Sequence, residues 1–184
     1  MRIISGKYKG RRFDKRLPNG IRPTTDSIKE TVFNILSNLI EFDDISVCDI
    51  FAGSGGLGFE SISRGATFCT FVDKSSKALR YIDEFAKYIR IDKANYECIK
   101  SDTMKYLRQE QNMTYDAFFV DPPYDLRIGD TVVNAIIDNG LLTDNGIIVA
   151  ESATTDGLVL PENYEIFHHK IFGTTQVHFI GKKE

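Results

Sequence analysis

The stretch "DIFAGSGGLGFE", residues 49 to 60, decides the fold class of this 184-residue chain. It follows the apolar run "ISVC" and leads into a short predicted helix that ends at Arg64, and its glycines Gly53, Gly55 and Gly58 fit the spacing G-x-G-x-x-G. Glycine permits positive φ angles and lets backbone amides approach a ligand closely. The same spacing occurs in tight turns without a ligand, so this stretch alone predicts a strand, a loop and a helix and leaves the ligand open.

Strand-like and helical patterns alternate on both sides of this loop. Strands are predicted at residues 45–52, 67–72, 96–101, 115–120 and 146–152, with helices between them ending at 64 and spanning 75–90, 103–110 and 129–140. This alternation predicts an α/β fold with a mostly parallel sheet and helices on both faces. Two further strand-like runs, 164–172 and 175–181, are separated by Gly173 and Thr174 and predict a closing hairpin.

Length and composition favour one main domain. A hydrophobic fraction of 42% in 184 residues is enough for one sizeable core, and we divide the chain into a basic arm with its connecting helix (residues 1–40) and a body (residues 41–184). No apolar run approaches the roughly 18 residues of a membrane span and no secretory signal is evident, so a cytoplasmic location is expected. Cys48, Cys69 and Cys98 show no paired spacing and three histidines are few for a metal site, so no metal is expected.

Basic charge is concentrated at the start of the chain. Residues 1–30 hold nine Lys and Arg against three acids, whereas the remaining residues hold fourteen against twenty-three, which gives the overall net charge of -3. The run "RIISGKYKGRRF" alternates apolar and basic positions around Gly6 and Gly10 and predicts a short hairpin with exposed basic side chains at Lys7, Lys9, Arg11 and Arg12. From charge alone, contact with a nucleic acid and a merely solubilising role both stay open.

The segment "RPTTDSIKETVFNILSNLI", residues 22–40, predicts the helix that joins the arm to the body. Its apolar residues keep helical spacing, and Thr24, Thr25, Asp26 and Ser27 are candidate N-caps, with Ser27 and Glu30 as a possible capping box.

The loop "DPPY", residues 121–124, follows the predicted strand 115–120 directly. Two prolines remove two backbone donors and fix the chain direction, so a carboxylate and two rigid carbonyls are held at the end of a buried strand. In an open parallel sheet of order 3-2-1-4-5, ligands bind at the carboxyl ends of strands 1 and 4, where the strand order reverses. The glycine loop and the DPPY loop are therefore expected to face each other across one crevice.

The chain resembles the Rossmann-like methyltransferases that use S-adenosylmethionine (SAM) to modify exocyclic amines. The resemblance rests on four stretches in this order: "DIFAGSGGLGFE", the acid of "FVDKS", the acid of "KSDTMKYL" and "DPPY". "MRIISGKYKGRRF", "RPTTDSIKETVFNIL" and the closing "KIFGTTQVHFI" narrow the resemblance to the RsmD family, over nearly the whole chain. This resemblance implies a seven-stranded sheet of order 3-2-1-4-5-7-6. It also implies methyl transfer to N2 of a guanine of 16S rRNA, position 966 in the family.

The resemblance also implies a cofactor site. Gly53, Ser54 and Gly55 would wrap the methionine moiety of SAM with Asp49 near its amino group, while Asp73 would hold the ribose and Asp102 the adenine amine. Plain helix capping is the alternative for both Asp73 and Asp102. The full set expected at the cofactor is Asp49, Phe51, Ala52, Gly53, Ser54, Gly55, Asp73, Lys74 and Asp102.

On the substrate side, Asp121 and the carbonyl of Pro122 would accept the two N–H bonds of the target amine and direct its nitrogen toward the methyl group. Pro123 would keep the loop rigid and Tyr124 would stack on the base, which has to be unpaired or extruded. A loop that merely caps a strand is the simpler alternative. Phosphate contacts are expected from Lys7, Lys9, Arg11, Arg12 and Arg22; Arg22 and Thr24 could equally touch the cofactor or only begin the helix.

Three other functions remain in view. Another exocyclic-amine methyltransferase, acting on DNA or on another RNA, is the first. N6-adenine and N4-cytosine DNA methyltransferases share the DPPY logic, as does a protein-glutamine methyltransferase, although these enzymes usually carry Asn where Asp121 stands. An NAD-dependent oxidoreductase would also use the glycine loop, and a non-catalytic RNA-binding module would use only the arm. The expected partner is 16S rRNA, within an assembling small ribosomal subunit, with no membrane involved.

Overall fold

The protein is built around one seven-stranded sheet of order β3-β2-β1-β4-β5-β7-β6. This computed structural model describes residues 1–21, 24–109, 113–122, 129–154 and 157–183. The pairs β2–β3, β1–β2, β1–β4 and β4–β5 are parallel, whereas β7 pairs antiparallel with both β5 and β6. The predicted strand order and the closing hairpin are therefore confirmed.

The elements follow the alternation read from the sequence. The strands are β1 (Ser46–Ile50), β2 (Phe68–Asp73), β3 (Tyr96–Lys100), β4 (Tyr115–Val120), β5 (Leu142–Ala153), β6 (Tyr164–Phe172) and β7 (Thr175–Lys182). The helices are α1 (Asp26–Leu36), α2 (Gly56–Arg64), α3 (Ser76–Ile89), α4 (Thr103–Arg108) and α5 (Gly129–Asp138), with a 3-10 turn η1 (Lys93–Asn95) before β3. Thr25 caps α1 by accepting a hydrogen bond from the amide of Ile28, so the capping box proposed for Ser27 is wrong.

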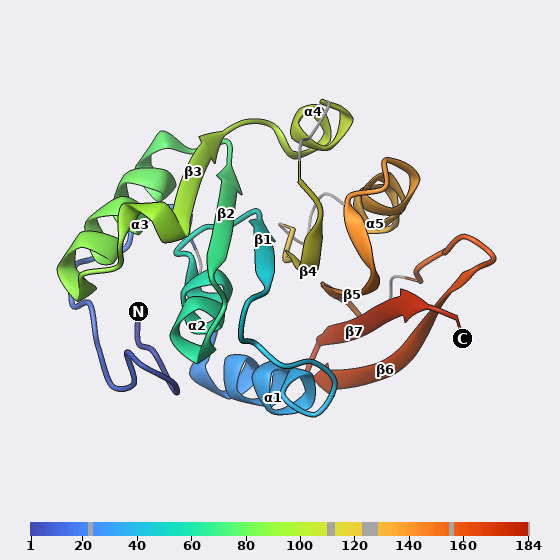
Figure 1. Ribbon diagram of the computed structural model, residues 1–184, viewed down its shortest axis with the longest axis horizontal. Coiled ribbons are helices and arrows are strands. Elements are labelled where there is room, and N and C mark those ends of the chain that lie inside the picture. The colour runs from blue at the N-terminus through green and yellow to red at the C-terminus, as the bar shows by residue number, and fades with distance from the viewer. Residues whose placement is uncertain (22–23, 110–112, 123–128, 155–156, 184) are drawn as a thin grey trace.

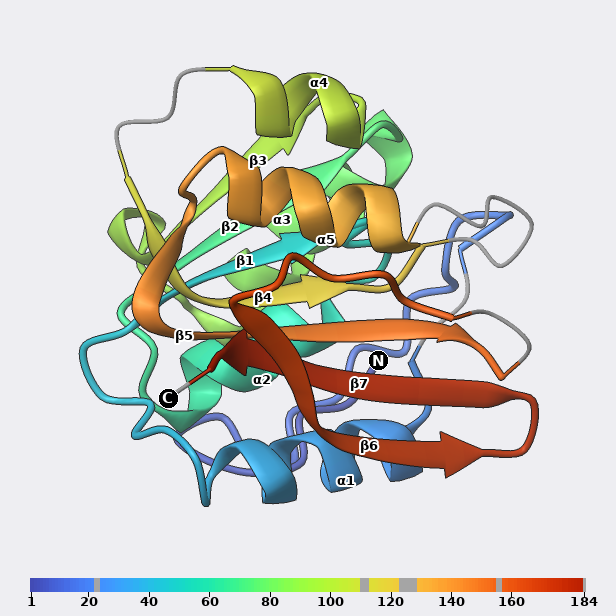
Figure 2. The same ribbon diagram turned by 90° about the vertical axis from the view of Figure 1, so that its right-hand side faces the viewer.

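Each face of the sheet carries its own core, as alternation along the strands requires. Val47, Phe71 and Phe119 point to the face covered by α1, α2 and α3, whereas Cys48 and Phe118 point to the face covered by α4 and α5 (Figures 1 and 2). Helices cover both faces, which is why the central strands are apolar on both sides.

The N-terminal arm, defined here as residues 1–13, packs against the α1–α3 face. One antiparallel bridge between Arg2 and Arg12 closes it, and Ile3 is buried with an exposed fraction of 1%. The ring of Phe13 lies 5.1 Å from that of Tyr81 and 5.3 Å from that of Phe85, both on α3. The arm thus shares the core of the body, while its basic side chains at Lys7, Lys9, Arg11 and Arg12 are exposed.

Within the described ranges, none of the helices combines the length and the apolar character needed to span a membrane.

Candidate active site

The glycine loop between β1 and α2 turns sharply by using positive φ angles at three positions. Phe51, Gly53 and Gly55 have φ angles of 61°, 53° and 74°. A Cβ atom at Gly55 would lie 2.9 Å from a ring carbon of Phe59, and one at Gly58 would lie 2.3 Å from the ring of Phe71. Glycine is thus required at Gly55 by its conformation and at Gly58 by the close packing of α2 on β2. The backbone of the loop is left at the sheet edge, close to where a ligand would bind.

Two carboxylates hold this loop from the sheet. Asp73, the last residue of β2, accepts hydrogen bonds from the amide of Gly53 (2.9 Å) and from the amide of Ser75 (2.7 Å). Asp49 is 3% exposed and accepts one from the amide of Gly58 (2.9 Å). Burial raises the pKa of Asp49 well above its usual range, and the negative charges of Asp121 and Asp73 raise it further. The hydrogen bond from the Gly58 amide acts in the opposite direction and lowers the pKa. Both acids therefore act structurally on the loop.

A row of residues crosses the carboxyl edge of four neighbouring strands. The last residues in register on these strands are partners of one another: Val72 of β2, Ile50 of β1, Val120 of β4 and Ala150 of β5. The next residue in each chain segment is Asp73, Phe51, Asp121 and Glu151, respectively. The sequence prediction that the glycine loop and Asp121 lie at one edge is thus consistent with the register.

Asp121 has an unusual environment for a carboxyl group. Burial is the main cause that raises its pKa to about 7, and the negative charge of the neighbouring Glu151 adds to it. Such a shift is common at catalytic sites, where a carboxyl group has to exchange protons near neutral pH. Pro122 is buried beside it. Pro123 and Tyr124, predicted to complete this loop, lie outside the described residues.

The remaining predicted cofactor residues lie around the loop. Ala52 and Ser54 are buried, and Lys74 is exposed next to Asp73. Asp102 is exposed and caps α4 by accepting a hydrogen bond from the amide of Lys105 (3.1 Å), as the alternative interpretation expected. Arg22 lies outside the described residues, and Thr24 directly precedes Thr25, the N-cap of α1.

Sequence analysis missed two residues near this site, Glu151 and Ile21, and a third, Glu60, that lies against the N-terminal arm. Glu151 ends the apolar part of β5, and only the register with β4 shows that it lies beside Asp121. Ile21 approaches the loop, since its Cγ2 atom would lie 3.4 Å from a Cβ atom at Gly53. Glu60 is completely buried on α2. Of the three, Glu151 alone had a usable signal, an acid at the end of a predicted neighbouring strand.

Among the residues that the structure describes, no group of three or more His, Cys, Asp or Glu side chains is arranged to hold a metal ion.

The strand order, the glycine loop after β1 and the acid at the end of β2 define the class of Rossmann-like methyltransferases. Solved structures with this fold agree. A putative methyltransferase from Escherichia coli superposes with a TM-score of 0.88 at 28% identity and covers 100% of this chain and 98% of that chain. A putative methylase from Haemophilus influenzae gives a TM-score of 0.82 at 29% identity, with the same coverage.

Sequence comparison gives the particular family. The family model described as "Conserved hypothetical protein 95" matches residues 1–181. The "Ribosomal RNA small subunit methyltransferase D" of Buchnera aphidicola (subsp. Acyrthosiphon pisum) is 35% identical over 95% of this chain and 89% of its own length. The protein of that name from Escherichia coli K12 is 33% identical over 94% of this chain and 85% of its own. The chain belongs to this family, and the resemblance to RsmD proteins is confirmed.

Proposed function

We propose that this protein transfers a methyl group from SAM to the exocyclic N2 amine of a guanine in small-subunit rRNA, at position 966 as in the family. The observation that carries the proposal is the match of nearly the whole chain to relatives named ribosomal RNA small subunit methyltransferase D. The arrangement of the site supports it, because the glycine loop and Asp121 follow register partners at one edge of the sheet.

The residues at this edge fit SAM. The positive φ angles of Gly53 and Gly55 form a backbone cradle, and Asp73 and Asp121 are close enough for their charges to act on Asp49. A cluster of carboxylates suits a ligand that carries a sulfonium and an ammonium group. When bound, SAM supplies an electrophilic methyl group, so the protein has to orient the nucleophile rather than activate a covalent one.

Individual contacts with the cofactor follow from the positions of the side chains. Gly53, Ser54 and Gly55 would surround the methionine moiety, with Phe51, Ala52 and Lys74 around the same cradle. Asp73 already accepts two backbone amides, but each carboxylate oxygen has a second lone pair, so it can still accept hydrogen bonds from ribose hydroxyls. Asp102 caps α4 through Oδ1, which leaves Oδ2 for an adenine amine.

Catalysis would depend on Asp121 and Pro122. The lone pair of a guanine amine is delocalised into the ring, so the amine has to be held in an attacking geometry. The Asp121 carboxylate and the Pro122 carbonyl would accept its two N–H bonds, and Asp121, with its pKa near 7, can take up the proton that the nitrogen loses. Pro123 would stiffen the loop, and Tyr124 would stack on the base.

The direct test is transfer of tritiated methyl groups from SAM to in vitro transcribed 16S rRNA and to partly assembled small subunits, followed by nucleoside analysis. N2-methylguanosine in either substrate is the expected product. Label in N6-methyladenosine or N4-methylcytidine would instead favour the alternative exocyclic amines. No transfer to any of these substrates would contradict the proposal.

The exposed basic residues of the arm are proposed to contact rRNA phosphates, together with Arg22. Replacing Lys7, Lys9, Arg11 and Arg12 by Gln should reduce the slope of log affinity against log salt by about 3, since each phosphate contact contributes roughly 0.7 to 0.9. SAM affinity should stay unchanged. Equal salt slopes for the variant and the wild type would show that the arm has only a solubilising role.

A further inference from the structure

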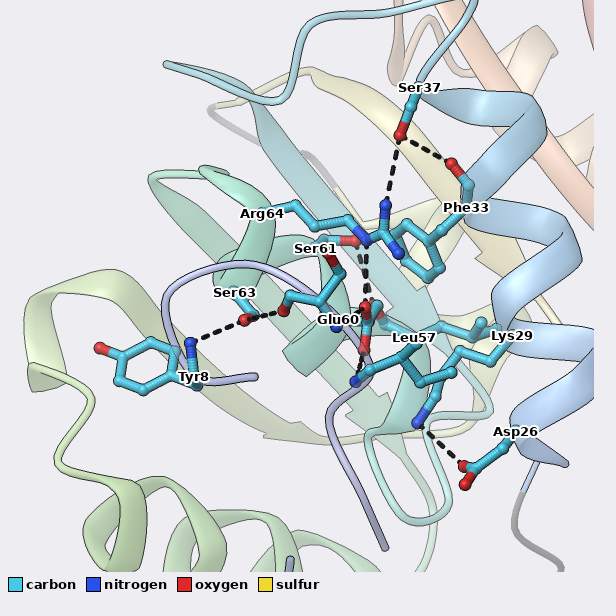
Figure 3. A network of polar contacts seen from close by, with 12 residues as sticks. Tyr8, Asp26, Lys29, Phe33, Ser37, Leu57, Glu60, Ser61, Ser63 and Arg64 are labelled. Carbon is cyan, nitrogen blue, oxygen red and sulfur yellow. Dashed lines mark hydrogen bonds and ion pairs between the residues drawn. The ribbon is translucent and has the colours of Figure 1, made fainter. Parts of the chain in front are cut away.

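The outer surface of α2 is covered by the backbone of the N-terminal arm (Figure 3). Glu60, on α2, has an exposed fraction of 0%. Its Oε2 atom accepts a hydrogen bond from the amide of Ile4 (2.8 Å), and its Oε1 atom accepts one from the amide of Ser5 (2.9 Å) and one from Nε of Arg64 (3.0 Å). A buried carboxylate is stable only when it is paired and hydrogen-bonded. Two of its three donors here are main-chain groups of the arm.

One turn further along α2, Ser63 continues the contact. Its hydroxyl donates to the carbonyl of Ser5 (2.5 Å) and accepts from the amide of Tyr8 (3.0 Å), while its own carbonyl accepts from the amide of Lys7 (2.6 Å). Gly6 lies directly over this turn, because a Cβ atom there would be 1.8 Å from the carbonyl oxygen of Ser63. The close approach therefore requires glycine at this position.

A residue of α1 holds the arm as well. Lys29 is 2% exposed, its ammonium group donates to the carbonyl of Arg2, and Asp26 lies 3.7 Å away. Burial lowers the pKa of Lys29, although the charges of Glu60 and Asp26 oppose this shift. Side chains of α1 and α2 thus bind the main chain of the arm, in addition to the core packing of Ile3 and Phe13. The basic side chains Lys7, Lys9, Arg11 and Arg12 stay exposed.

We propose that Glu60 is a positioning residue for RNA: together with Ser63 it fixes the arm on α2, so that Lys7, Lys9, Arg11 and Arg12 are presented in one place relative to the cofactor loop. This inference rests on the proposed contact of the arm with rRNA. The helix that carries Glu60 is capped by Gly55 of the glycine loop. A single helix of nine residues, about 14 Å long at 1.5 Å per residue, therefore joins the cofactor side to the arm.

The first test compares two glycines of the arm. Gly6 and Gly10 have nearly equal φ angles, 78° and 80°, but a Cβ atom at Gly10 would meet nothing within 4 Å. Gly6→Ala should displace the arm from α2 and reduce the salt slope of 16S rRNA binding by about 3, although all four basic side chains are still present. Gly10→Ala carries a similar backbone strain and should keep most of the slope. SAM affinity should be unchanged in both variants.

The second test acts from the helix. Glu60→Gln places a carboxamide NH₂ group against an arm amide, so the amides of Ile4 and Ser5 should lose protection from hydrogen exchange, and the salt slope should fall as in Gly6→Ala. Ser61→Ala is the matched control, because Ser61 is equally buried on α2 but donates only to the carbonyl of Leu57 (3.0 Å). Ser63→Ala is a milder variant with the same expected direction, in case Glu60→Gln does not fold.

The outcomes separate this inference from the proposed function. If replacing the four basic residues by Gln lowers the salt slope but Gly6→Ala does not, the positioning role is overturned and the RNA contact stands. If the replacement of the four residues leaves the slope unchanged, the proposed RNA contact itself fails. Unchanged exchange protection of Ile4 and Ser5 in Glu60→Gln would also overturn the positioning role.

Discussion

The two ends of α2 use the same interaction for different purposes. At the N-terminal end, Asp73 and Asp49 accept hydrogen bonds from amides of the glycine loop and of α2. From the middle of α2 toward its C-terminal end, Glu60 and Ser63 accept hydrogen bonds from amides of the N-terminal arm. Asp73 remains partly exposed, whereas Glu60 is completely buried and receives three donors. A partly exposed carboxylate at the sheet edge can meet a ligand, whereas a carboxylate that is completely buried beneath the arm can only fix the chain.

The largest effect is expected at Asp121, which follows β4 at the same sheet edge as the glycine loop. Asp121→Ala should reduce turnover at least about a hundredfold, because its contacts are made at the reacting amine. SAM affinity, measured by calorimetry, should stay within a few-fold of the wild type. Turnover close to normal would remove Asp121 from the mechanism. The sheet edge beside the glycine loop would then have no identified catalytic residue.

Asp73→Ala should weaken SAM binding by about 1 to 3 kcal/mol, the range for losing hydrogen bonds to a charged group. The glycine loop would also lose the acceptor for the Gly53 amide. Asp92→Ala is the matched control, because Asp92 only caps the 3-10 turn by accepting from the amide of Ala94 (3.0 Å). Equal SAM affinities of the two variants in titration calorimetry would argue against the ribose assignment.

Glu60→Gln should show the opposite behaviour. A buried donor left without a partner costs about 1 to 3 kcal/mol, so the free energy of unfolding in urea should fall by this amount. The carboxyl group of Glu60 faces the arm, so SAM affinity should not change. A loss of SAM affinity comparable to that of Asp73→Ala would contradict the difference between the two ends of α2.

A smaller effect is expected from Glu151, the acid that lies beside Asp121. Because Asp121 has to be ionised to accept from the amine, kcat/KM should rise with pH through about 7, the pKa of the free protein. Glu151→Gln removes one of the two causes of that raised pKa, so the rising limb should move to lower pH. The profile of kcat/KM between about pH 5.5 and 8.5 measures this shift. An unmoved limb would show that Glu151 does not influence Asp121.

The smallest effect is expected at Asp102, which follows β3 and is the N-cap of α4. Asp102→Ser keeps an N-cap residue at α4, so stability should change by less than about 1 kcal/mol. If Asp102 also accepts a hydrogen bond from the adenine amine, SAM affinity should fall a few-fold. Unchanged SAM affinity in calorimetry would leave Asp102 as a helix cap alone.

The sequence by itself determined the strand and helix alternation, the positions of the turns and the place of the glycine loop. These features depend on local patterns: apolar periodicity, glycine where φ is positive, and proline where an amide is not needed. The resemblance to the RsmD family then supplied the strand order. For the same reason, Asp121 and Asp73 could be placed at one edge, since each acid directly follows a predicted strand.

Only the tertiary structure decided how the carboxylates are used. Glu60 and Ile4 are 56 residues apart, and Glu151 lies beside Asp121 because of the register of β4 and β5. The hydrogen bonds that hold the arm and the glycine loop join a side chain to main-chain amides. Every residue except proline offers such an amide, so no pair of residue types in the sequence reveals the contact. Folding brings the two segments together, and burial then gives the contact its strength.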